Sequence, residues 1–127
     1  MSEILFVGHI GKLIKVAGGV KNTHSKYGDR RMEIMADCLP DTLDEQVRNE
    51  WTDRIFGCNT TEEALEYLKS WGICDQVMHT AVSRMQHYMK QWAGGNCDVQ
   101  VVTFSTVYGI LGKTSDSDRM IERWRHS

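Results

Sequence analysis

"DQVMHTAVSRMQHYMKQWAGGNCDVQVVTFS", residues 75–105, contains the strongest periodic patterns of the sequence. Apolar residues from Val77 to Trp92 recur at helical spacing, and a pair of glycines follows as a stop signal. Residues 97–105 then alternate between apolar and polar side chains, as in a half-buried strand. We therefore expect a long core helix that leads directly into a strand of a sheet.

The neighbouring segments extend this pattern in both directions. Upstream, residues 41–57 and 60–72 each combine a polar helix start with apolar residues three or four apart and a final glycine. Downstream, residues 106–113 alternate as a further strand, and residues 115–126 have the pattern of a short helix. These segments predict helices that pack against a C-terminal hairpin.

The N-terminal part of the chain is expected to supply further strands. Residues 3–16, "EILFVGHIGKLIKV", contain apolar runs broken by two glycines, which favours a hairpin or a sharply bent strand. Residues 30–38 alternate in hydrophobicity, as in a strand that ends before Pro40. We predict one α+β domain over residues 1–127, in which N-terminal and C-terminal hairpins form a largely antiparallel sheet with three to four helices packed on one face.

Composition and cysteine spacing are those of an ordinary globular domain. Hydrophobic residues make up 41% of the 127 residues and charged residues 25%, which is far from the composition of disordered chains. The four cysteines form no C-x-x-C pair, and the first apolar run is too short for a signal peptide or a membrane span. We expect a cytoplasmic protein with free thiols that uses no metal or cofactor and does not bind a membrane.

Charge is distributed unevenly along the chain, although the net charge is only −2. Residues 8–31 contain six Lys or Arg and one acid, whereas residues 32–75 contain eleven acids and three bases. A second group of cations lies in the C-terminal helix. If both groups converge in space, they form an anion site with an aromatic ring available for stacking. The predicted ligand-binding residues are Lys21, His24, Lys26, Tyr27, Arg30, Arg31, Arg119 and Arg123.

No complete catalytic signature is present, and we assign no catalytic residue. The "GILGKT" sequence at residues 109–114 has too few residues between its glycines to form a phosphate-binding loop. The leading hypothesis is a non-enzymatic binding module, of the inhibitor or sequestering type found among phage and mobile-element accessory proteins. Such a module would recognise a partner protein or an anionic, nucleotide-like small molecule through its basic surface, and we expect it to form a homo-oligomer.

Two other function classes stay open. A small enzyme could act on a nucleotide-like substrate, with His24 or His79 as general base and arginines holding phosphate. A weak single-stranded nucleic-acid binder could use the N-terminal strands as a platform and the basic loop, residues 15–31, as a backbone clamp. A nucleic-acid binder should lose affinity steeply with salt, whereas an enzyme should lose turnover when one histidine is removed.

Overall fold

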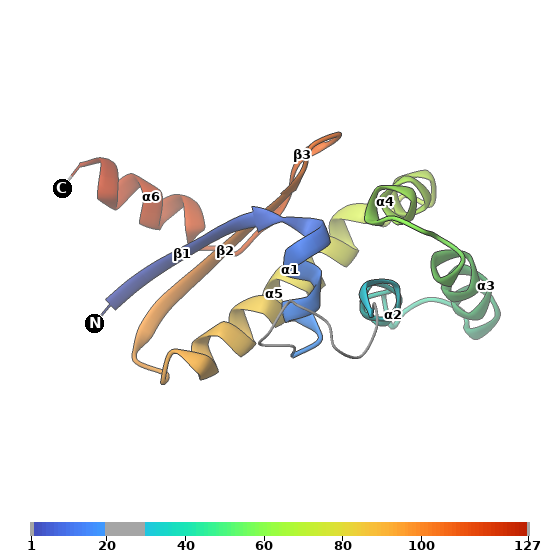
Figure 1. Cartoon of the computed structure of the whole chain (residues 1–127), viewed down its shortest axis with the longest axis horizontal. Coiled ribbons are helices and arrows are strands. Elements are labelled where there is room, and N and C mark those ends of the chain that lie inside the picture. Colours follow the sequence, from blue (N-terminus) through green and yellow to red (C-terminus); the bar gives the residue numbers. More distant parts are fainter. Residues whose placement is uncertain (1, 20–29, 127) are drawn as a thin grey trace.

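A computed structural model, which describes residues 2–19 and 30–126, shows a three-stranded sheet flanked by helices (Figure 1). The elements follow in the order β1 (Ser2–His9), α1 (Ile10–Ala17), α2 (Arg31–Asp37), α3 (Glu45–Phe56), α4 (Thr61–Ser70), α5 (Cys74–Trp92), β2 (Cys97–Ser105), β3 (Gly109–Lys113) and α6 (Ser117–Arg125). The predicted α+β class is confirmed. The described part of the chain forms six helices rather than three to four.

The sheet is mixed, with the strand order β1-β2-β3. Strand β1 runs parallel to β2, in a register that pairs Ser2 with Cys97 and His9 with Phe104. Strand β3 runs antiparallel to β2, with an irregularity between Thr103 and Phe104. The C-terminal hairpin is thus present, whereas the N-terminal strand joins the sheet through a partner that lies far away in the sequence.

The hairpin predicted for residues 3–16 is wrong, because β1 leads directly into helix α1. The Nδ1 atom of His9 accepts a hydrogen bond from the backbone N–H of Gly11 at 3.0 Å, which caps the first turn of the helix. A Cβ atom on Gly8 would lie 2.9 Å from Cγ of Leu13. The glycines in this segment therefore serve a tight strand-to-helix turn.

The strand predicted for residues 30–38 is also wrong, since α2 occupies most of this range. Its buried side chains include Ile34, Met35 and Cys38, which follow helical spacing. A segment of this length that is apolar at most positions fits a period of 2 as well as a period of 3.6, so hydrophobicity alone does not separate the two structures.

The helices predicted further along the chain are present, with small shifts at their ends. Asp44 caps α3, and its carboxylate accepts a hydrogen bond from the backbone N–H of Gln46 at 3.2 Å. Thr60 caps α4 by accepting from the backbone N–H of Glu63 at 3.2 Å. Local capping chemistry therefore placed these helices correctly, within a few residues.

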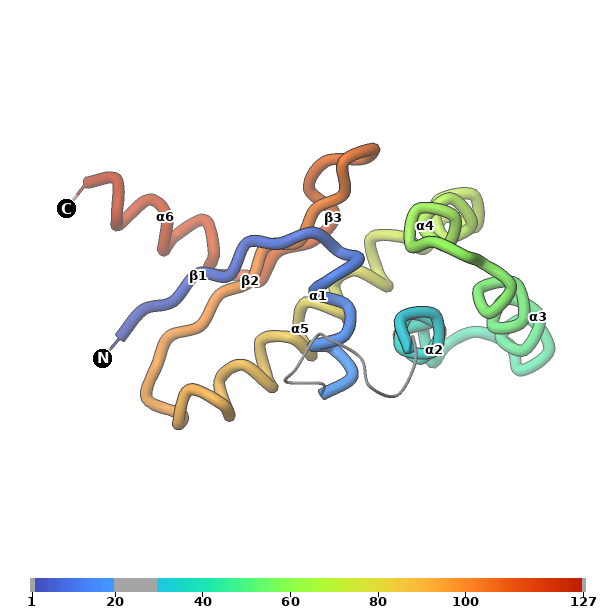
Figure 2. The backbone as a smooth tube through the Cα atoms, viewed as in Figure 1, coloured from blue at the N-terminus to red at the C-terminus, as the bar shows by residue number. Residues whose placement is uncertain are grey.

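Helices cover both faces of the sheet rather than one. The central residues of β2, 99–103, are all buried, which requires cover on each side. Helices α1 and α5 lie along one side, and α6 contacts β1 and β2 from the other (Figures 1 and 2). None of the helices in the described part of the chain combines the length and apolar character that crossing a membrane requires.

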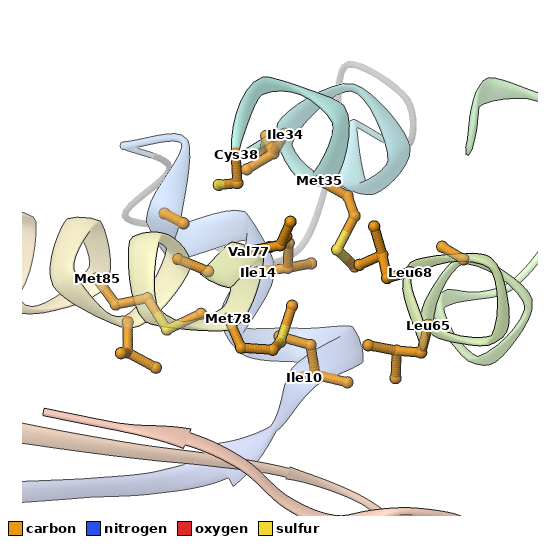
Figure 3. Close-up of a cluster of buried hydrophobic side chains, with 14 of the residues drawn as sticks. Ile10, Ile14, Ile34, Met35, Cys38, Leu65, Leu68, Val77, Met78 and Met85 are labelled. Atoms are coloured by element: carbon orange, nitrogen blue, oxygen red, sulfur yellow. The ribbon is translucent and has the colours of Figure 1, made fainter. Parts of the chain in front are cut away.

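The main core lies where α1 packs between α2, α4 and α5 (Figure 3). Ile10 and Ile14 of α1 and Met78 of α5 are completely buried there. Other side chains of this cluster come from α2, α4 and α5: Ile34, Met35, Cys38, Leu65, Leu68, Val77 and Met85. The core fixes α2 and α5 relative to each other, and their outer faces border the site described next.

Candidate functional site

A cavity of about 770 Å³ lies among the end of α1 and helices α2, α3 and α5. This volume falls in the range of known small-molecule sites, which is about 300 to 1,000 Å³. Small side chains, namely Ala17, Gly18, Ala36 and Ser83, form part of its lining and leave the space open. Three helices that are separate in the sequence therefore line an open cavity with a volume suited to an organic ligand.

Helix α5 contributes one wall through Ser83, Arg84, His87 and Tyr88. Their spacing places all four side chains on one face of the helix. The opposite face carries buried apolar residues such as Met85, which hold α5 in the core. The wall is therefore rigidly positioned, because the same helix anchors the centre of the molecule.

Helix α3 contributes a second wall through Arg48, Thr52 and Phe56, which lie four residues apart. The side chain of Phe56 is 53% exposed, an unusual state for so large an apolar group. The Nη1 atom of Arg48 donates to the carbonyl oxygens of Leu39, at 3.1 Å, and Pro40, at 2.9 Å. Arg48 thereby ties α3 to the segment that follows α2 and fixes the width of the cavity on this side.

Arg84 is held at the edge of the cavity by the carboxylate of Asp37. Its Nη1 lies 2.6 Å from Oδ2 of Asp37. Burial alone would lower the pKa of Arg84, but the hydrogen bond to Asp37 and nearby negative charge more than offset this effect, so the pKa is raised. The guanidinium is therefore a permanent cation whose orientation is set by one acid.

The cavity lining carries more positive than negative charge. Arg30, Arg48 and Arg84 contribute three guanidinium groups, whereas Glu33 and Asp37 contribute two carboxylates. Each acid is paired with one of these arginines: Nη2 of Arg30 lies 3.5 Å from Oε1 of Glu33, and Asp37 is paired with Arg84. The arrangement suits a ligand that brings its own carboxylates to the rim of the cavity.

Cys38 lies beside this charge pair but has no role as a nucleophile. Its side chain is only 1% exposed, and burial raises its pKa to about 11, although Arg84 partly opposes this effect. The thiol of Cys38 therefore stays protonated near neutral pH. A reactive or metal-binding cysteine, by contrast, acts as a thiolate.

The predicted site residues are distributed over different parts of the molecule. Arg30 lines the cavity, and Arg31 follows it as the first residue of α2, where it is half-buried. Gly18 lines the cavity from the other end of the basic loop. Four predicted residues lie outside the described part of the chain: Lys21, His24, Lys26 and Tyr27.

The two predicted arginines of α6 do not line the cavity. Nη2 of Arg123 lies 3.1 Å from Oε2 of Glu3 and 3.5 Å from Oδ2 of Asp98, so this residue fastens α6 to the beginnings of β1 and β2. Arg119 is exposed and lies 3.8 Å from Asp116 one turn earlier. The structure therefore brings Arg30 together with arginines of α3 and α5. It leaves Arg123 near the N-terminal ends of β1 and β2, and Arg119 beside Asp116.

Sequence reasoning missed Arg48, Arg84 and His87. The last two lie on the polar face of the helix that the sequence predicted best, at spacings that place them side by side. That spacing could have indicated one side of a binding site. It does so only when the position of a second helix facing these residues is known, and the sequence does not give that position. Arg48 carried no comparable signal, because its position depends on the packing of α3 beside α2.

Comparison with known proteins gives a consistent family. A model described as "CbiD, C-terminal domain" matches residues 22–115. The cobalt-precorrin-5B C(1)-methyltransferase of Fusobacterium nucleatum is 36% identical over 121 residues, which cover 94% of this chain and 30% of that protein. The enzyme of the same name from Alkaliphilus metalliredigens is 35% identical over 129 residues, covering 96% of this chain and 31% of that protein. No solved structure matches the chain.

These findings correct the predicted function and partners. The relatives are named as methyltransferases, so the prediction of a non-enzymatic inhibitor or phage accessory module is wrong. The predicted partners are corrected too: the relatives are named for a small-molecule substrate, cobalt-precorrin-5B, rather than for a partner protein, a nucleotide-like ligand or a nucleic acid, and these findings give the predicted homo-oligomer no support. The chain spans about a third of the length of these relatives. Since the family model matches most of the sequence, the chain belongs to the family of CbiD C-terminal domains.

Proposed function

We propose that the chain is the substrate-holding part of a cobalt-precorrin-5B C(1)-methyltransferase, and that the cavity among α2, α3 and α5 binds the corrin precursor. The family match and the shared name of the relatives support the reaction, the transfer of a methyl group to carbon 1 of cobalt-precorrin-5B. Because the chain spans about a third of those enzymes, we assign it substrate binding and leave the site of the methyl donor unassigned.

The chemistry of the substrate matches the lining of the cavity. A precorrin is a tetrapyrrole macrocycle whose rim carries acetate and propionate groups, so its site needs apolar walls for the ring and cations for the carboxylates. The rings of Phe56 and Tyr88 supply apolar surface, and Arg30, Arg48 and Arg84 supply the cations. This combination in a cavity of about 770 Å³ is the observation that carries the proposal.

Arg84 is the strongest candidate for contact with a rim carboxylate. Nη1 of Arg84 donates a hydrogen bond to the carboxylate of Asp37, which fixes the orientation of the guanidinium group before the ligand binds. The group can then present further N–H donors to a carboxylate with little loss of side-chain freedom. Arg30 lines the same cavity from the segment that enters α2. Together the two arginines would hold different parts of the rim.

Binding of a cobalt corrin with free carboxylates tests this function. We expect equilibrium dialysis of the chain against cobalt(III) cyanocobyrinate to show saturable binding to one site. Arg84→Gln and Arg30→Gln should each weaken it about tenfold or more, because a hydrogen bond to a charged group contributes about 1.5 to 3 kcal/mol.

Arg119→Gln provides the matched control, because Arg119 is an exposed arginine of α6 outside the cavity. This variant should bind the corrin as the wild type does. A wild-type chain that binds no corrin, or a loss of affinity that is equal in all three variants, would overturn the proposed site.

Two further expectations stay proposals. We propose that residues 1–127 form a single domain, with one core shared by α1, α2, α4 and α5. We also propose a cytoplasmic location, supported by cysteines that remain free thiols, as proteins of reducing compartments keep them. From the ligand-binding residues predicted on sequence, the proposed function uses Arg30 and does not use Arg119 or Arg123.

A further inference from the structure

We infer that His87 is an axial ligand to the cobalt of the bound corrin, through its imidazole Nε2 atom. This assignment rests on the proposed function, since it requires a cobalt corrin in the cavity. The metal here is part of the substrate, so His87 would hold the macrocycle from above one face while the arginines hold its rim. The observations that support this role are the position of His87 and its neighbours.

His87 is the histidine that lines the cavity, among those in the described ranges 2–19 and 30–126. His9 caps α1, with its other ring nitrogen 3.4 Å from Glu62. His79 lies two turns earlier in α5 and lines a separate hollow beside β3. His126 follows the end of α6. The cavity therefore receives one imidazole, from the wall that also carries Arg84.

A single imidazole is enough for a metal that already sits in a corrin. The four ring nitrogens occupy the equatorial positions of the cobalt and leave the axial positions open. Imidazole is a common ligand of transition metals and binds in its neutral form. A free ion would need several protein ligands, and the part of the chain described by the structure holds no group of three His, Cys, Asp or Glu suited to one.

The proposed ligand atom of His87 has an exposed polar neighbour. Nε2 of His87 lies 3.3 Å from Nε2 of Gln91, one turn further along α5. Which of these two nitrogens donates depends on the tautomer of the imidazole ring. Metal binding requires the tautomer with the ring proton on Nδ1, which leaves Nε2 unprotonated. Gln91 is exposed, so its side chain is free to turn away when cobalt takes the electron pair of Nε2.

The neighbouring groups give His87 a defined place in the cavity. The ring of Tyr88 stands edge-on to the ring of His87, with centroids 5.3 Å apart and planes at 70°. Arg84 lies one turn before His87 on the same face, about 4.5 Å along the axis at the usual helical rise. One face of α5 thus offers a nitrogen for the metal and a guanidinium for the rim of the same macrocycle.

Electron paramagnetic resonance of cobalt(II) cobyrinate tests the assignment. This corrin has no axial nitrogen of its own, and an axial nitrogen donated by the protein splits each cobalt hyperfine line into a triplet. We expect the triplet with the wild-type chain and its loss with His87→Phe. The matched control is His79→Phe, which alters a histidine of the same helix outside the cavity and should keep the triplet.

Dialysis of the same samples separates the two ways in which the experiment can fail. Bound corrin without a triplet in the wild type, or a triplet that persists in His87→Phe, would overturn the axial ligand and leave the proposed function standing. If the wild-type chain binds no cobalt(II) cobyrinate, the proposed function fails and the axial ligand fails with it. A triplet lost in both histidine variants would also contradict the assignment to His87.

Discussion

Cys38 and Arg84 show how one small neighbourhood keeps a cation charged and a thiol neutral. Nη1 of Arg84 lies 2.6 Å from the Asp37 carboxylate and 3.9 Å from Sγ of Cys38. Hydrogen bonding to Asp37 raises the pKa of Arg84, whereas burial raises the pKa of Cys38 to about 11. The edge of the cavity therefore presents a fixed guanidinium without a competing thiolate.

This neutral thiol predicts a fall in stability at alkaline pH. Below pH 9.0, the ordinary value for the group, Cys38 is protonated in both the folded and the unfolded chain. Between about pH 9 and 11 the unfolded chain loses the proton while the folded chain keeps it, so rising pH stabilises the unfolded chain. At about 1.4 kcal/mol per pKa unit, Cys38 should account for a loss of up to roughly 3 kcal/mol.

Urea unfolding at a series of pH values measures this contribution. Cys38→Ala should show a shallower decline between pH 9 and 11 than the wild type, because the buried thiol is gone. Cys97→Ala is the control, since Cys97 is a half-buried cysteine at the start of β2. If Cys38→Ala declines as steeply as the wild type, the buried thiol is not the cause.

At the scale of elements, the junction between β1 and α1 shows what local patterns miss. The glycines of this junction fit a hairpin as well as a strand-to-helix turn. The sequence pattern of residues 3–16 therefore predicted a hairpin where the structure has a strand followed by a helix. The true partner of β1 is β2, and parallel pairing needs a long crossover that no local window contains. Helices α4 and α5, by contrast, carry their apolar faces within their own residues, and α4 also has a local cap in Thr60, so both helices could be predicted from the sequence.

The histidine cap at this junction predicts a measurable contribution to stability. His9→Ala removes the acceptor for the Gly11 N–H, and this should lower the free energy of unfolding by about 1 kcal/mol. His9→Asn should recover most of the loss, because an Asn side chain can cap the helix in the same way. Thermal and urea unfolding of the two variants measure the difference. If Asn does not recover stability, the effect belongs to the neighbouring Glu62 or Phe104 instead.

At the scale of the whole molecule, the fold class was more predictable than the site. The α+β class follows from the periodicity of separate segments, and each segment can be judged alone. The site depends on the packing of α2, α3 and α5 around one cavity. The distribution of charge along the sequence does not indicate which helices lie next to one another. Arg30 of the basic loop reaches the cavity, whereas Arg123 of the second cation cluster is paired with Glu3 and Asp98.

The same scale explains why the functional hypothesis failed. A binding site made of arginines, a histidine and aromatic rings from different helices leaves no motif in the sequence, so the absence of a catalytic signature was taken as absence of an enzyme. The family match corrected this interpretation, and the cavity is the site that we propose for the substrate, which the match by itself does not locate.

The central claim is that the cavity among α2, α3 and α5 holds a cobalt corrin, and paramagnetic nuclear magnetic resonance tests it most directly. Amide signals of the labelled chain would be recorded with cobalt(II) cobyrinate and compared with those of the diamagnetic cobalt(III) form. We predict the strongest signal loss at amides around the cavity, such as those of Ala36, Thr52 and Ser83, with Arg119 of α6 unaffected. Signal loss centred on α6 or on the sheet, with the cavity amides unchanged, would contradict the claim.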